Sequence, residues 1–177
     1  AFRYAYEPLV FSTAAHDREG QNKVYADAMK FFIIFALLAF LAVMFYLDIL
    51  KFIIGSTYWE GLKVVPIVML AEIFMGVYFN LSFWYKLTDQ THYGAWFSLT
   101  GCVVIVLLNI FLIPIYGYMA CAWGGVAGYG TAMVLSYIMG QKKNPINYPM
   151  MSIAVYVAIA ALFTAVIMWS NSHLPAL

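Results

Sequence analysis

The longest stretch without a charged side chain constrains this sequence more than any other feature. Residues 90–141 contain no Asp, Glu, Lys or Arg, and Glu72 is the one charge within residues 64–85. A soluble domain carries charge on roughly a quarter of its residues. Here charged residues make up 10% of the chain and hydrophobic residues 65%. The sequence therefore predicts an all-α polytopic membrane protein, whose helices cross a bilayer several times.

Apolar segments long enough to cross a bilayer recur along the chain. A spanning helix needs about 20 mostly apolar residues. Five such segments are expected at about 24–47, 62–85, 93–113, 119–139 and 150–169. Pro114 is expected to close the fourth, because proline cannot donate the next helical hydrogen bond. Residues 1–15 are expected to be the end of a further helix that begins upstream. We therefore expect about five transmembrane helices plus part of another, in one lobe over residues 1–177.

The short connections between these segments carry an uneven distribution of positive charge. In short loops, the side richer in Lys and Arg stays in the cytoplasm. The polar connections expected at 16–23, 86–92 and 141–149 are therefore predicted to face the cytoplasm, and those near 55–61 and 116–118 the opposite side. The richer set holds Arg18, Lys23, Lys30, Lys86, Lys142 and Lys143, and the poorer set Lys51 and Lys63.

Glu72 is the most informative polar residue within the apolar segments. It lies roughly 13 Å along its predicted helix from Lys63, at a 1.5 Å rise per residue. A carboxylate at that depth costs a few kcal/mol unless it faces protein or water. Gly76 and Asn80 follow at four-residue steps, so acid, gap and amide share one helix face. This stripe fits either the open wall of a hydrated proton or sodium pathway or a contact between helices.

Arg3 and Glu7 lie four residues apart near the beginning of the chain, a spacing that permits an ion pair. An intramembrane guanidinium is also suited to grip phosphate, because its fork donates two hydrogen bonds to one oxyanion. Phosphate recognition and mutual neutralisation are both compatible with this pair. Together with Glu72 and Asn80, the two residues form the candidate substrate or ion pathway.

Small residues recur at four-residue steps in the segment at 119–139, namely Ala120, Gly124, Gly128 and Ala132. Such spacing lets another helix approach closely. We expect tight packing within the molecule, with a dimerisation face as the alternative.

No motif for an enzyme, metal or cofactor site is evident. The three histidines are scattered, and Cys102 and Cys121 lie in apolar segments without ligand-like spacing. Phosphate-loop and nucleophile-elbow patterns are absent from the sequence. We expect no enzymatic activity, no cofactor and no metal. A net charge of +1 without a long basic run gives no reason to expect a nucleic-acid partner.

Several segments resemble those of bacterial polysaccharide flippases. They are WEGLKVVPI at 59–67, NLSFWYKLTDQTHYGA at 80–95, the Asn109, Pro114 and Gly117-Tyr118 pattern, and SYIMGQK at 136–142. The opening RYAYEPLVFSTA at 3–14 is similar to the end of a helix that precedes a cytoplasmic loop in these proteins. The family belongs to the multidrug/oligosaccharidyl-lipid/polysaccharide exporter superfamily, and the pattern is closest to members that serve capsule and lipopolysaccharide (O-antigen) biosynthesis.

The resemblance implies the C-terminal lobe of a two-lobed transporter, with an N-terminal lobe upstream on the same chain. Such a protein would move an undecaprenyl-pyrophosphate-linked oligosaccharide across the bacterial inner membrane by alternating access. Its partners would be that lipid-linked oligosaccharide, membrane lipids, the N-terminal lobe, and a coupling H⁺ or Na⁺. Among the candidate residues, Arg3 alone could offer a cation to the pyrophosphate.

Two other functions are compatible with the sequence. The first is a multidrug cation antiporter of the same superfamily (a MATE-like transporter), with Glu72 or Glu7 as its proton or sodium site. The second is a membrane-embedded glycan polymerase or glycosyltransferase, for which large extramembrane loops with carboxylates would be expected. The loops read from this sequence are short.

Overall fold

The computed structural model describes residues 18–173, and within that range it forms helices without a single strand. The elements are α2 (Arg18–Ile53), the 3₁₀ helix η1 (Ser56–Val64), α3 (Val65–Leu81), α4 (Phe83–Leu87), α5 (His92–Tyr116), α6 (Tyr118–Lys143) and α7 (Met150–His173). The all-α prediction is confirmed for these residues. The partial helix expected at 1–15 lies outside the described range.

Within residues 18–173, four helical segments are long and apolar enough to cross a membrane: Asn22–Leu47, Tyr58–Lys86, His92–Tyr116 and Met150–Ile167. They are the helices of a multi-pass membrane protein. α6 is 26 residues long but is not among the four, because its many glycines and tyrosines lower its hydropathy. It carries no charge before Lys142. A fifth span through α6 therefore stays a prediction.

Several expected connections are partly helical, among them 55–61, most of which lies in η1. α2 begins at Arg18, so most of the polar loop expected at 16–23 forms its first turns. α6 continues to Lys143, past the expected end at residue 139, because Gln and Lys are good helix formers. The third expected helix is divided into η1, α3 and α4.

Pro114 does not end α5 as the sequence predicted, because it lies inside the helix. The helix ends at Gly117, whose φ of 59° suits glycine better than any residue with a side chain. The backbone N–H of Gly117 donates to the carbonyl oxygen of Ile113 over 2.8 Å. A single residue, Gly117, thus separates α5 from α6.

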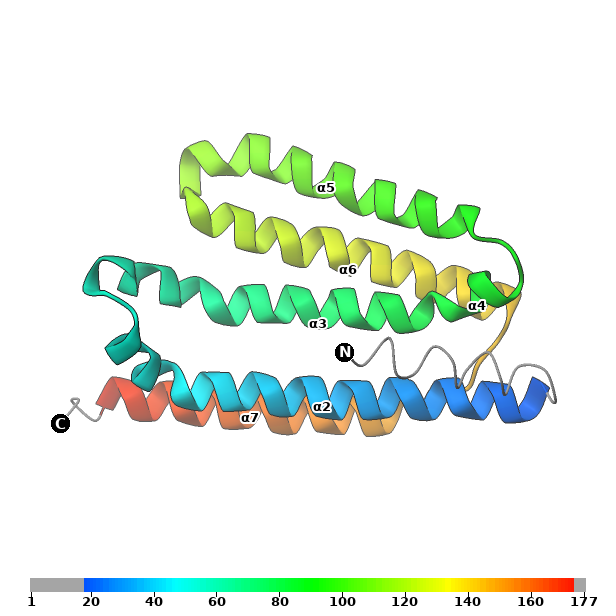
Figure 1. Ribbon diagram of the computed structural model, residues 1–177, viewed down its shortest axis with the longest axis horizontal. Coiled ribbons are helices and arrows are strands. Elements are labelled where there is room, and N and C mark those ends of the chain that lie inside the picture. Colours follow the sequence, from blue (N-terminus) through cyan, green and yellow to red (C-terminus); the bar gives the residue numbers. More distant parts are fainter. Residues whose placement is uncertain (1–17, 174–177) are drawn as a thin grey trace.

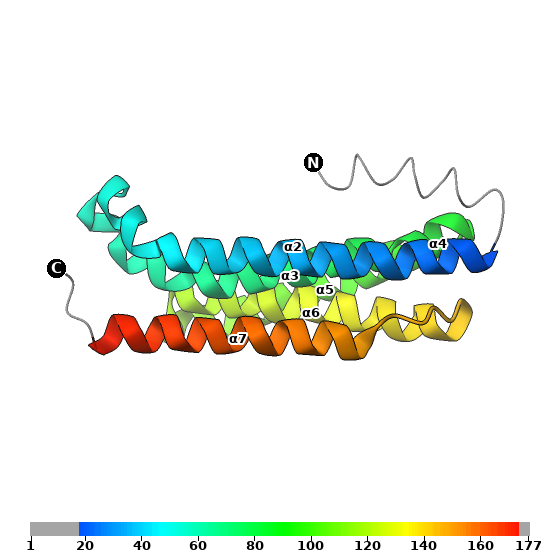
Figure 2. The same cartoon turned by 90° about the horizontal axis from the view of Figure 1, so that it is seen from below.

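The helices form two groups that run side by side (Figures 1 and 2). In the first group, α6 lies between α5 and α3 and packs closely on both. In the second group, α2 packs on α7, and α2 also joins the first group through α3. The beginning of α2, α4 and the end of α6 lie at one end of the molecule, which we call the lysine-rich end. η1 and the α5–α6 turn lie at the opposite end, so the two predicted sets of connections are separated.

The small residues of α6 pack inside the molecule. All four of the residues singled out at four-residue steps are buried. A Cβ atom placed on Gly101 of α5 would lie 2.9 Å from the carbonyl oxygen of Gly128, closer than side chains normally approach backbone. The two helices therefore meet backbone to backbone at this point, and the expectation of tight intramolecular packing is confirmed.

Candidate functional site

An apolar cavity of about 340 Å³ lies between the two helix groups. Four helices form a ring around it: α2, α3, α6 and α7. Its lining consists of aliphatic, methionine and aromatic side chains, such as Ile33, Val77, Met133 and Ile153. An apolar cavity of this kind excludes water and accepts hydrocarbon.

The cavity lies toward the lysine-rich end. α3 contributes its last residue, Leu81, and α7 its first, Met150. Met29 lies in the first half of α2, and Tyr137 near the end of α6. The site therefore occupies one half of the bundle rather than its middle.

A small hydrophobic cluster separates the cavity from the lysine-rich end. Tyr25 of α2 stacks on Phe83 of α4 with ring centroids 6.0 Å apart, and both are buried with Ala26 and Ile146. Ile146 lies in the connection between α6 and α7. It is held there because Gln141 Nε2 donates a hydrogen bond to its carbonyl oxygen over 2.7 Å. Tyr148, which lines the cavity, packs against this cluster.

The gap expected at Gly76 is filled by an aromatic ring. A Cβ atom placed on Gly76 would overlap the Phe32 side chain of α2. Asn80 Nδ2 donates a hydrogen bond to the Gly76 carbonyl oxygen over 3.0 Å, within α3 itself. Of the two interpretations of the stripe formed by Glu72, Gly76 and Asn80, the Phe32 ring at its centre favours the contact between helices.

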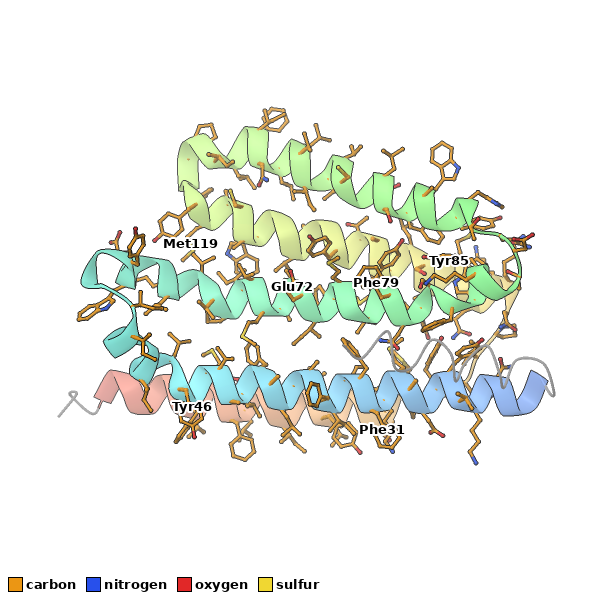
Figure 3. All side chains as sticks on the ribbon, in the orientation of Figure 1. Phe31, Tyr46, Glu72, Phe79, Tyr85 and Met119 are labelled. Carbon is orange, nitrogen blue, oxygen red and sulfur yellow. The ribbon has the colours of Figure 1, made fainter. Side chains whose placement is uncertain are left out.

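The structure places Glu72 on α3, where it is exposed and does not line the cavity (Figure 3). It makes no hydrogen bond or ion pair within residues 18–173. Arg3 and Glu7 lie outside the described residues, so the four candidate residues are not brought together. Within the described range, no cluster of His, Cys, Asp and Glu could hold a metal ion.

Sequence reasoning missed a polar network between α3, α4 and α5. The Tyr78 hydroxyl donates to the Gly94 carbonyl oxygen over 3.1 Å and lies 2.9 Å from Ser98 Oγ. The Tyr85 hydroxyl donates to the Tyr78 oxygen over 3.4 Å. The only signal in the sequence is the seven-residue spacing of the two tyrosines, which favours one helix face.

Lysine side chains at the lysine-rich end lie over aromatic rings. Lys86 Nζ is 5.3 Å from the ring centroid of Phe83, and Lys143 Nζ is 5.5 Å from that of Tyr93. Both distances are within the range of a cation–π contact. Aromatic and cationic side chains gather in this way at membrane–water interfaces.

No protein-family model, curated protein or solved structure matches this chain. The fold defines the class of protein, a multi-pass helical membrane protein with an apolar cavity between two helix groups. A more specific function therefore has to be proposed from the residues.

Proposed function

We propose that the chain is one lobe of a transporter that moves an undecaprenyl-pyrophosphate-linked oligosaccharide across the bacterial inner membrane. The observation that carries the proposal is the division of the described helices into two groups, α3 with α5 and α6, and α2 with α7, which meet mainly where α2 packs on α3. The resemblance of residues 59–142 to polysaccharide flippases supplies the substrate class.

Alternating access requires groups of helices that move against each other as units. α3, α5 and α6 form a tight unit, because glycines let α5 and α6 touch through their backbones. Of the second group, α2 meets this unit along α3, whereas α7 packs mainly on α2. Movement of the two groups at this narrow contact costs less free energy than separating α5 from α6 would.

The alternative functions have less support. A cation antiporter is less favoured, because the connector KLTDQTH at residues 86–92 resembles that of polysaccharide flippases. A polymerase or glycosyltransferase would need carboxylates in large loops. Between residues 18 and 173, the helices are joined by short connections.

On this proposal, Glu72 faces the second lobe and carries the coupling H⁺ or Na⁺. We expect Glu72→Gln to keep the fold, because the side chain is exposed and makes no hydrogen bond in the described range. The variant should lose most of its transport, because an amide carries no negative charge that could take up a proton or neutralise a bound sodium ion. Glu60→Gln, at an exposed position in η1, is the matched control. Normal transport by Glu72→Gln across pH and sodium concentrations would remove Glu72 from the mechanism.

The test of the proposed function is rescue of a bacterial strain that lacks its polysaccharide flippase. We expect the chain expressed with its N-terminal lobe to restore surface polysaccharide. The 177-residue chain alone should not, because recognition of a pyrophosphate calls for more hydrogen-bond donors than Arg3 can supply. Rescue by the 177 residues alone would contradict the two-lobe proposal, and failure of both would contradict the function.

A further inference from the structure

The ring of helices around the cavity is packed on three sides and loose on the fourth. α2 packs on α3, α3 on α6, and α2 on α7, whereas α6 and α7 barely touch. Three residues that line the cavity are also exposed, namely Val134 of α6 and Met150 and Val157 of α7. The cavity therefore opens sideways between α6 and α7, at the outer surface of the helix bundle.

The two helices that border this opening carry positive charge at one end. α6, α7 and the connection between them contain two charged residues, Lys142 and Lys143. Both are exposed at the end of α6, the helix that borders the opening, and Lys143 Nζ also lies 5.5 Å from the ring centroid of Tyr93 on α5. A lysine near a membrane surface attracts anionic lipid headgroups by about 1 kcal/mol, which is about fivefold in affinity.

The size of the cavity limits its occupant. A volume of about 340 Å³ holds roughly eleven methylene groups, if each takes about the 30 Å³ of a water molecule in the liquid. That matches most of one phospholipid acyl chain. An undecaprenyl chain is several times too large to be enclosed, so the cavity is better suited to a lipid of the surrounding membrane.

We propose that the opening between α6 and α7 binds one acyl chain of an anionic phospholipid, with the phosphate beside Lys142 and Lys143. The acyl chain enters past Val134 and Val157 and fills the space between the two helix groups. The lipid replaces the helix–helix contact that α6 and α7 do not make. This site is separate from that of the transported lipid and does not depend on the proposed transport.

The site can be tested by photolabelling the full chain in phosphatidylcholine nanodiscs. The probe is phosphatidylglycerol with a diazirine in the middle of one acyl chain. We expect labelled peptides from residues 133–137 and 150–157. Val134→Trp should block the opening and remove most of this labelling. Val106→Trp on α5 is the matched control, because the two valines are 48% and 49% exposed and Val106 does not line the cavity.

Val157→Trp, on the opposite side of the opening, gives a second test if Val134→Trp does not fold. The proposal is overturned if labelling of these peptides persists in a folded variant of either kind. It is also overturned if a polyprenyl phosphate probe labels the same peptides more strongly, because the site would then belong to the transported lipid.

A double variant tests whether the two lysines are needed to bind the anionic headgroup. Lys142→Gln combined with Lys143→Gln should reduce phosphatidylglycerol labelling about tenfold or more, since two attractive lysines are removed. Lys63→Gln, at the opposite end, should leave labelling unchanged. Equal labelling by a phosphatidylcholine probe with the same diazirine would overturn the preference for an anionic lipid.

Discussion

Gly128→Ala is expected to destabilise the bundle, whereas Gly125→Ala is expected to be tolerated. A Cβ atom on Gly128 would lie 2.8 Å from the carbonyl oxygen of Gly101 and would overlap Ile105. A Cβ atom on Gly125 would lie 3.6 Å from the Ala71 Cβ, an ordinary contact. The same added methyl group therefore meets backbone at one position and a small gap at the other.

The two variants should change the stability of the protein in opposite directions. Overpacking at Gly128 should cost about 1–3 kcal/mol, and alanine at Gly125 should gain up to about 1 kcal/mol of helix propensity. Thermal unfolding in detergent, followed by circular dichroism, measures the difference. We expect Gly128→Ala to unfold several degrees below the unchanged protein. If both variants unfold at the same temperature, α5 and α6 do not meet as the structure shows.

The helices themselves could be predicted from the sequence, because uncharged apolar runs in a membrane admit few other structures. The packing of α6 was also predictable, since its small residues repeat at four-residue steps. Helix ends were less predictable. Pro114 was expected to stop α5, but a proline near the end of a helix costs one hydrogen bond, and the left-handed conformation of Gly117 stops the helix instead.

The candidate site was harder to predict, because it depends on contacts between distant segments. Gly76 was interpreted as a gap beside Glu72, and nothing within α3 shows that Phe32 of α2 fills it. The cavity and the opening between α6 and α7 depend on how the two helix groups lie together. Single-helix patterns therefore identified polar residues correctly but could not say which of them face a cavity.

The second prediction is that α6 crosses the membrane, which thiol labelling on its two sides should show. If α6 crosses the bilayer, the turn before it and the connection after it lie on opposite sides. Its low hydropathy argues against crossing, but α6 has no charge before Lys142 and packs between α3 and α5, both part of membrane-spanning segments. A helix covered by neighbours on two faces needs less lipid-facing surface, so small and aromatic residues are tolerated there.

Single cysteines on either side of α6 test this arrangement and the orientation together. The positions are Thr91, Tyr116 and Asn147, all exposed, in a chain whose Cys102 and Cys121 are replaced by alanine. Cells with a permeable outer membrane are treated with a thiol reagent that cannot cross the inner membrane. The cysteine-free chain, which should stay unlabelled, is the control.

Both the proposed transport and the proposed lipid site assume that α6 crosses the inner membrane. Both also assume that the lysine-rich end lies in the cytoplasm. We expect labelling of Tyr116→Cys in intact cells, and of Thr91→Cys and Asn147→Cys only after the inner membrane is broken. Labelling of Asn147→Cys together with Tyr116→Cys in intact cells would show that α6 does not cross. Labelling of Thr91→Cys in intact cells, with Tyr116→Cys protected, would reverse the orientation and contradict the predicted positive-inside arrangement.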